Sequence, residues 1–299
     1  MMKEERIKIA LQKSGRLTDH TLELLQKCGL VITKGKDQLI AYGENMPFDL
    51  LYVRDDDIPS LVKDGLCDLG FVGLNVVMEK NLQFKLLSDE EPFSIEEALD
   101  FGQCRLSFAY PDEGDIQSIK DLEGKTVATS YPRIVGDYID QQKLNINVTE
   151  FTGAVELAPG LGKSDAICDL ISSGSTLRAH NLTEGEMILE SSAVLISSNN
   201  RFSEYKQQWV NKLLERVNGV LQVRESKYIM MHAPRDAIDK ISALLPGSEF
   251  PTIIPLEGTE KMVALHMVCL ENVFWETLEN LKGEGASSIL VVPVEKMLA

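Results

Sequence analysis

The sequence lacks the residue spacings of the common metal-binding and disulfide-rich proteins. Its 299 residues include five cysteines and four histidines. The cysteines are odd in number and scattered, and no two of them have C-x-x-C spacing. This argues against a thiolate zinc site or a disulfide framework. The histidines form neither H-x-x-H nor H-E-x-x-H, so no pair is spaced to bind a metal from one helix face. We therefore expect reduced, buried thiols and no histidine metal centre.

Membrane segments and an excess of positive charge are also missing. No apolar run approaches the roughly 18 residues of a membrane span, and the opening MMKEER has no apolar core of a secretory signal. Acidic residues outnumber basic ones by 46 to 30, giving a net charge of −16. Nucleic acids and anionic membranes bind basic surfaces, so we expect a cytoplasmic protein with neither partner. A small anionic ligand is still compatible if a few cations, backbone N–H groups or Mg²⁺ converge locally.

What the sequence does contain is an alternation of short apolar runs and amphipathic segments. A hydrophobic content of 44% and a length of 299 residues suit a globular protein of about two or three domains. The alternation predicts an α/β fold, and a second set of such signals that begins near residue 104 predicts two lobes. The expected strands are 7–11, 39–42, 49–54, 67–73, 105–110, 126–130, 165–171 and 193–196. The expected helices include 58–62, 75–80, a segment after 131–132, and 205–223.

The last part of the chain has a different order of elements. We expect strands at 228–232, 252–255, 262–268 and 288–292, with helices at 234–245 and 272–282. This βαββαβ order is that of a ferredoxin-like domain. The domain should begin near Ser226.

The strongest chemical signal follows the expected strand 165–171. The strand runs into Ser172, Ser173, Gly174, Ser175, Thr176 and Leu177. A glycine lets the backbone approach a ligand, and hydroxyls with successive N–H groups at a helix start favour an anion. Asp169 could accept hydrogen bonds from ribose hydroxyls or reach Mg²⁺ through water. The loop is not a Walker A motif, and a capped strand–helix turn without ligand is an equally ordinary interpretation.

Three further candidate sites lie where other strands should end. Lys13 and Arg16 follow the first strand, where they could neutralise phosphate or be solvated surface charge. Arg54 ends another strand and precedes three aspartates, of which Asp57 is predicted to cap the next helix. Thr18 is predicted as the cap of the first helix. Gly73 belongs to a weak glycine-rich turn. Together these positions favour a nucleotide or sugar-phosphate ligand.

Several motifs resemble the long form of ATP phosphoribosyltransferase, and the resemblance runs nearly end to end. Its most specific parts are 165–177 and 228–234. The others are QKSGRL (12–17), ENMP (44–47), VRDDDIP (53–59), DLG (68–70), ATSYP (128–132) and PTIIP (251–255). The resemblance implies a bilobal, periplasmic-binding-protein-like catalytic core followed by a ferredoxin-like, ACT-like regulatory domain. The implied limits are 1–103 with 184–224 for lobe I, 104–183 for lobe II and 225–299 for the regulatory domain.

The resemblance also implies a reaction and its partners. N1 of ATP would attack C1 of phosphoribosyl pyrophosphate (PRPP) with inversion, and pyrophosphate would leave, helped by Mg²⁺. The product would be phosphoribosyl-ATP, in the first step of histidine biosynthesis. Family members form dimers and hexamers, and histidine inhibits them by binding between regulatory domains.

Site residues follow by position in the family. The 5-phosphate of PRPP would meet Ser172, Ser173, Gly174, Ser175, Thr176 and Leu177, and its ribose hydroxyls Asp169. Triphosphate or pyrophosphate would meet Lys13, Arg16 and Arg54, with Gly73 nearby and Tyr110 stacking near adenine. Glu156 would orient the nucleophile or the metal-bound diphosphate. The histidine pocket would be lined by His232, Ser248, Thr252, Val268 and Ser288, although His232 alone would be interpreted as a core residue.

Two alternatives compete with this interpretation. Prephenate dehydratase has a similar core and an ACT domain, but the Thr-Arg-Asp signature of that enzyme is absent, since Val53 precedes Arg54 and Asp55 here. A non-catalytic solute-binding or sensor protein is the other, and no signal segment or helix-turn-helix supports it.

Overall fold

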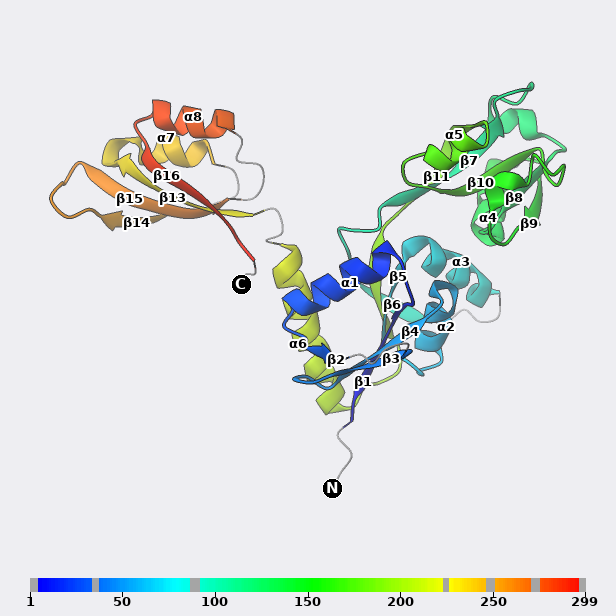
Figure 1. Cartoon of the computed structure of the whole chain (residues 1–299), viewed down its shortest axis with the longest axis horizontal. Coiled ribbons are helices and arrows are strands. Elements are labelled where there is room, and N and C mark those ends of the chain that lie inside the picture. The colour runs from blue at the N-terminus through cyan, green and yellow to red at the C-terminus, as the bar shows by residue number, and fades with distance from the viewer. Residues whose placement is uncertain are drawn as a thin grey trace. The chain divides into compact units, whose positions relative to one another are not determined.

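The strands of the chain form three separate sheets, of seven, five and four strands. The computed structural model describes residues 5–33, 38–86, 92–222, 226–245, 251–269 and 275–295. One compact unit comprises 1–23 and 30–210, and the other 24–29 and 211–299 (Figure 1). The first unit holds the seven- and five-stranded sheets, and the second holds the four-stranded one. No helix in the described ranges is both long and apolar enough to cross a membrane.

The seven-stranded sheet has the order β2-β3-β4-β1-β5-β12-β6. Its central strand β1 is parallel to β4 and β5, and its apolar run is buried, as in parallel sheets covered on both faces. The strands are β1 Ile7–Gln12, β2 Ile32–Thr33, β3 Ile40–Gly43, β4 Phe48–Val53, β5 Leu69–Gly73, β6 Phe93–Ala98 and β12 Ala193–Ser198. The helices are α1 Arg16–Lys27, the 3₁₀ helix η1 Asp55–Asp57, α2 Ile58–Lys63, α3 Leu74–Lys85 and α6 Glu204–Leu221.

The predicted N-cap at Thr18 is wrong, and Asp57 lies at the predicted N-cap position but does not cap the helix through its side chain. Thr18 lies inside α1, which already begins at Arg16, and its hydroxyl donates to the Gln12 carbonyl at 2.8 Å. Asp57 precedes α2 with helical backbone angles, and its side chain makes no capping hydrogen bond. The 3₁₀ turn of which it is part leads directly into α2, so its carboxylate is not placed over free N–H groups.

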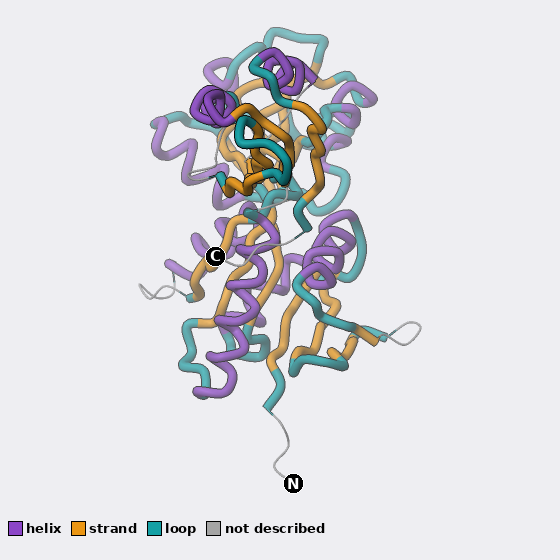
Figure 2. Tube along the Cα trace, turned by 90° about the vertical axis from the view of Figure 1, so that its left-hand side faces the viewer, coloured by secondary structure: helices purple, strands orange, loops and turns teal. Residues whose placement is uncertain are grey.

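The five-stranded sheet has the order β11-β7-β10-β8-β9. Strand β7 is antiparallel to both β11 and β10, and β10, β8 and β9 are parallel. β11 pairs with β7 up to Ser191, so this sheet extends beyond the expected limit of 183. Its strands are β7 Cys104–Pro111, β8 Thr126–Thr129, β9 Asn147–Glu150, β10 Ala166–Ile171 and β11 Leu182–Ser191. Its helices are η2 Ile119–Leu122, α4 Pro132–Gln142, η3 Val155–Leu157 and α5 Ser175–Ala179. Figure 2 colours the helices purple and the strands orange along the Cα trace.

The four-stranded sheet of the second unit has the order β14-β15-β13-β16. Its elements confirm the predicted βαββαβ order: β13 Lys227–Pro234, η4 Arg235–Ala237, α7 Ile238–Ala243, β14 Thr252–Pro255, β15 Met262–Cys269, α8 Trp275–Gly283 and β16 Ser287–Pro293. One face carries the core, in which alternate residues such as Ile229, Met231 and Leu265 pack with Ile241 and Leu281 from the helices. The predicted α/β fold class with two lobes and a ferredoxin-like domain is therefore confirmed.

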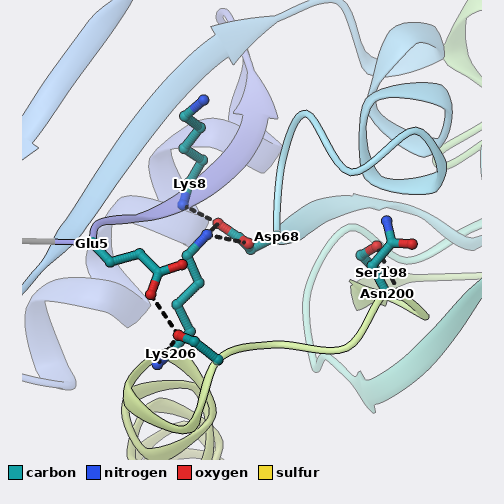
Figure 3. A network of polar contacts seen from close by, with 7 residues as sticks. Glu5, Lys8, Asp68, Ser198, Asn200 and Lys206 are labelled. Atoms are coloured by element: carbon teal, nitrogen blue, oxygen red, sulfur yellow. Dashed lines mark hydrogen bonds and ion pairs between the residues drawn. The ribbon is translucent and has the colours of Figure 1, made fainter.

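A buried carboxylate joins three elements of the seven-stranded lobe. Asp68, which precedes β5, accepts the N–H of Lys8 at 2.8 Å and the ammonium of Lys206 from α6 at 2.7 and 3.0 Å (Figure 3). Only 11% of the Asp68 side chain and 17% of that of Lys206 are exposed. Since each charge is largely removed from water, each depends on the other for compensation.

Replacing Asp68 by alanine is expected to lower the free energy of unfolding by about 2–4 kcal/mol, because it leaves the Lys206 ammonium buried without its partner. Urea denaturation measures this loss. The control is Asp64→Ala, which breaks a pair at 3.6 Å whose carboxylate is 58% exposed and should cost under about 0.5 kcal/mol. Equal losses in the two variants would contradict this account.

Candidate active site

The loop after β10 has the conformation that its glycine makes possible. Gly174 adopts φ 69° and ψ 7°, the left-handed region in which a β-carbon is strained. The nearest atom to a β-carbon built there would be a guanidinium nitrogen of Arg178 at 3.4 Å, so the backbone angle rather than crowding requires glycine. The hydroxyls of Ser173 and Ser175 lie 3.0 Å apart across this turn. The loop thus presents hydroxyls and main-chain groups ahead of the short helix α5.

A cavity of about 310 Å³ brings this loop together with three of the predicted catalytic side chains. Arg16 reaches it from the first turn of α1 in the other lobe, Glu156 from η3, and Asp169 from β10. The remaining lining residues come from β10 and the loop: Ile167, Leu170, Ile171, Ser172, Ser173, Gly174, Ser175, Thr176 and Leu177. One cation, two carboxylates and a loop rich in N–H and hydroxyl donors suit a phosphorylated sugar.

Asp169 is electrostatically the most perturbed carboxylate of the cavity. Burial, opposed by the backbone N–H of Leu170 and reinforced by the negative charge of Glu156, raises the pKa of Asp169 from 3.8 to about 6. The group is therefore ionised at neutral pH, and the burial of its charge lowers the free energy of unfolding there. A carboxylate held in this way accepts hydrogen bonds strongly and attracts positive charge.

Lys13, Arg54 and Gly73 lie at one edge of the seven-stranded sheet. They follow or end the parallel strands β1, β4 and β5, whose carboxyl ends share that edge, and the N–H of Lys13 donates to the Val53 carbonyl at 2.8 Å. None of the three lines the loop cavity. A β-carbon on Gly73 would lie 2.4 Å from Asn75 Oδ1, so this glycine leaves room for a neighbouring side chain.

A second cavity, of about 280 Å³, lies beside this edge. It is lined by Asp55 and Asp56 from η1, by Glu79 and Lys80 from α3, and by residues of the other lobe: Ser130, Tyr131, Pro132, Arg133, Glu150, Thr152 and Gly153. Burial, together with the adjacent Asp55 carboxylate, raises the pKa of Asp56. The ATSYP motif and the aspartate run therefore meet at one cavity between the two lobes of the first unit.

Sequence reasoning missed the side chains that join these lobes. Asn75 donates to the Tyr131 hydroxyl at 3.0 Å and accepts from Ser191 at 2.8 Å. Glu79, only 7% exposed, accepts the backbone N–H groups of Arg133 and Ile134 at 3.0 Å each. Glu79 thus supplies the acceptor that the first turn of α4 lacks. A glutamate within a helix carries no sequence signal of this long-range role.

Tyr110 lies in the core rather than in either cavity described above. Its side chain is 3% exposed and packs in the main core of the five-stranded lobe. Its hydroxyl donates to Glu186 on β11, and burial raises the tyrosine pKa. This placement does not support the expected stacking on adenine, because the ring offers no open face. β11, with its charged Thr-Glu-Gly-Glu start, was not predicted as a strand, so the partner of Tyr110 was missed as well.

Three of the residues expected to bind histidine share one sheet face. His232 pairs with Ala264, Val268 with Tyr228, and Thr252 with His266. The period-two alternation places all three on the face opposite the helices. Ser288 follows Ser287, the β16 partner of His232, and has φ 50°. Ser248 lies outside the described residues.

A protein-borne metal cluster is absent from the described residues. They contain no group of three or more histidine, cysteine, aspartate or glutamate side chains arranged to hold a metal ion. In the cavity lined by the loop, the carboxylates that could bind a cation are those of Glu156 and Asp169. Such a pair suits Mg²⁺ that arrives on a diphosphate, since Mg²⁺ commonly takes one or two carboxylates and substrate phosphates.

Comparison with known families covers most of the chain. The family model of ATP phosphoribosyltransferase matches residues 54–219, and the model of the HisG C-terminal domain matches residues 224–296. The first match includes Arg54, both cavity carboxylates and the loop, and the second includes the four-stranded sheet. These matches agree with the resemblance noted in the sequence.

One solved structure shares its fold with a large part of this chain. The ATP phosphoribosyl transferase (HisG:HisZ) complex from Thermotoga maritima matches with a TM-score of 0.57 and 24% identity, over 70% of this chain and 97% of that one. Weaker matches are the periplasmic VFT2 domain of BvgS from Bordetella pertussis (TM-score 0.46, 14% identity, 70% and 86% of the chains) and arginine-bound ArgBP from T. maritima (0.43, 12%, 70% and 93%).

Proposed function

Because the chain belongs to the ATP phosphoribosyltransferase family of histidine biosynthesis, in its long form, we propose that it transfers the phosphoribosyl group of PRPP to N1 of ATP. The C1–N1 bond forms, the bond from C1 to the pyrophosphate oxygen breaks, and the anomeric configuration inverts. The observation that supports this best is the loop cavity, which combines Arg16, Glu156, Asp169 and the glycine turn.

The 5-phosphate of PRPP is bound by residues 172–177. Their hydroxyls and main-chain N–H groups supply donors without a lysine, and the left-handed turn at Gly174 directs the chain around the anion. Asp169 accepts hydrogen bonds from the ribose hydroxyls. Holding both ends of the sugar fixes C1 relative to the nucleophile.

The charges of the site stabilise the transition state. Positive charge develops at the ribosyl C1 as pyrophosphate departs, and the carboxylates of Asp169 and Glu156 favour it, while Arg16 balances the diphosphate. Arg54 and Lys13, at the edge of the seven-stranded sheet, bind the triphosphate of ATP beside Gly73. Adenine N1 is itself nucleophilic, so the mechanism requires no strong general base.

Mg²⁺ is the proposed cofactor. When bound, it neutralises the diphosphate and so improves it as a leaving group. Glu156 and Asp169 would hold it together with substrate oxygens.

The test is incubation of the chain with ATP, PRPP and Mg²⁺. Pyrophosphatase is added to hydrolyse the pyrophosphate, because its accumulation favours the reverse reaction. Phosphoribosyl-ATP should accumulate and be detected by its ultraviolet absorbance. Absence of product from freshly prepared, folded protein would reject the proposal. Binding of a substrate without turnover would favour a solute-binding or sensor protein instead.

For regulation, we propose that histidine inhibits the cytoplasmic homo-oligomer, a dimer or hexamer, by binding to the domain formed by 225–299. His232, Thr252 and Val268 on the open sheet face support this, since backbone pairing brings them to neighbouring strands. Ser288 lies at the same end of the sheet as His232.

Deleting the residues after Val223 is expected to leave phosphoribosyl transfer measurable and to abolish its inhibition by histidine. The physical reason is that the four-stranded sheet has its own core, so its loss removes the ligand site without opening the other two sheets. Steady-state rates at increasing histidine measure the effect, with oligomeric state checked by light scattering. Full inhibition of a folded truncated enzyme would refute the assignment.

A further inference from the structure

Arg105 on β7 connects β11 to the start of the phosphate loop, which comprises residues 172–177. Its guanidinium binds Glu184 on β11 through both carboxylate oxygens, at 2.5 Å from Nε and 2.5 Å from Nη2. Its third nitrogen, Nη1, donates to the Ser172 carbonyl at 3.2 Å. One planar side chain thus donates hydrogen bonds to both the Glu184 carboxylate and the Ser172 carbonyl.

The strand register explains why this residue can do so. β7 lies between β11 and β10, and Arg105 pairs with Ile171, the last residue of β10 before the loop. On β11 the backbone partner of Arg105 is Glu190, and Glu184 pairs with Ala109, so the Arg105 side chain reaches Glu184 along the sheet face that it shares with Ser107. The register of β11 shifts between Glu184 and Met187, and such an irregularity redirects side chains. The buried Ser107 hydroxyl also donates to Glu184 at 3.0 Å, which holds the carboxylate toward Arg105.

We propose that Arg105 is a positioning residue for the phosphate loop, fixing the peptide between Ser172 and Ser173 so that its N–H faces away from Arg105 and serves the substrate anion. The inference rests on the proposed function. A trans peptide holds its C=O and N–H antiparallel in one plane, so anchoring the Ser172 carbonyl also fixes the Ser173 N–H. Without the anchor this peptide can rotate and turn a carbonyl oxygen toward the phosphate.

A lysine cannot replace the arginine in this arrangement. The planar guanidinium offers donors along separate edges, whereas an ammonium is a single point charge. Glu184 in turn fixes the plane of the guanidinium, and the hydrogen bonds from Arg105 lower the pKa of Glu184, which therefore stays ionised near neutral pH. The Glu184 and Arg105 side chains are expected to act as one unit.

The experiment compares Arg105→Lys, Arg105→Met, Glu184→Gln and the Arg105→Met/Glu184→Gln double variant in the full chain. Binding of ribose 5-phosphate is measured by calorimetry, and KM for PRPP, KM for ATP and kcat by steady-state kinetics. We expect a loss of ribose 5-phosphate affinity of about 10- to 100-fold in Arg105→Met, an equal rise in KM for PRPP, and little change in KM for ATP. The double variant should be no worse than Arg105→Met, as for residues in one network.

Thr183→Val is the matched control. It removes a 2.6 Å hydrogen bond to Asp112 between the same two strand regions, at the end away from the loop, and should bind ribose 5-phosphate as the wild type does. Wild-type affinity in Arg105→Met, or equal losses for ATP and ribose 5-phosphate, would overturn the proposal. Wild-type protein that binds ribose 5-phosphate but forms no product would refute the proposed reaction, while a selective loss in Arg105→Met would still support the positioning role. Wild-type protein that forms product but does not bind ribose 5-phosphate would overturn the positioning role and leave the proposed reaction standing.

Discussion

Replacing Asp169 by asparagine is expected to reduce kcat/KM for PRPP by about 10²- to 10³-fold while making the folded protein more stable at pH 8. The loss of activity follows because a neutral amide neither accepts hydrogen bonds from the sugar as strongly nor favours positive charge at C1. The gain in stability follows because the wild-type carboxylate is ionised in a buried place beside Glu156, which raises its pKa to about 6.

The stability effect has a definite pH dependence. Above about pH 6 the Asp169 carboxylate is charged in both the folded and the unfolded chain, and the cost of burying the charge is fully present. Between about pH 6 and 4 the folded state binds a proton that the unfolded state does not, so the wild type gains stability as the pH falls. The free energy of unfolding of Asp169→Asn should therefore exceed that of the wild type by about 1–3 kcal/mol at pH 8, and this difference should decrease toward pH 4.

Urea denaturation at several pH values and steady-state kinetics measure the two effects. Asp165→Asn is the control, since Asp165 precedes the same strand but is exposed and accepts the Thr126 N–H at 2.8 Å. It should retain kcat/KM and show no gain in stability. An active Asp169→Asn enzyme, or one that is less stable than the wild type at pH 8, would contradict the role given to this carboxylate.

Replacing Gly174 by alanine is expected to raise KM for PRPP at least about 10-fold. A β-carbon in the left-handed region costs about 1–2 kcal/mol, and relief of that strain changes the loop whose N–H groups face the phosphate. The stability loss should not exceed that amount, because the nearest atom to the new β-carbon is a side-chain nitrogen at 3.4 Å.

Gly162→Ala separates backbone strain from substrate binding. Gly162 has φ 67°, nearly the 69° of Gly174, and a β-carbon there would meet nothing within 4 Å. It lies in the same lobe but does not line the loop cavity. Both variants should lose similar stability, and only Gly174→Ala should lose affinity for PRPP. Equal KM values would show that the turn at Gly174 does not bind the substrate.

Local patterns were sufficient to predict most of the fold. The apolar runs of β1, β4, β5, β7, β8, β10 and β12 are buried on both faces or nearly so, and a continuous apolar run gives a clear signal. β6 and β11 were missed because they are partly exposed and carry glutamates, which propensity assigns to other structures. Their strand character comes from pairing with β12 and β7, distant in the chain.

The candidate site was predictable where its residues are contiguous. The loop 172–177 and Asp169 follow one strand, and local chemistry suggested their role. That Arg16 and Glu156 line the same cavity depends on how α1, η3 and β10 are brought together, which the sequence alone suggested only through the family resemblance. Glu79, Asn75 and Arg105 act through partners more than 50 residues away, and no local pattern marks them.

The most direct test of the account is a crystal structure of the chain soaked with PRPP and Mg²⁺. We predict the 5-phosphate within hydrogen-bonding distance of the N–H groups and hydroxyls of residues 173–177, with the ribose hydroxyls on Asp169. Density for the 5-phosphate at the second cavity, with Gly174 and Thr176 facing solvent, would contradict the central claim.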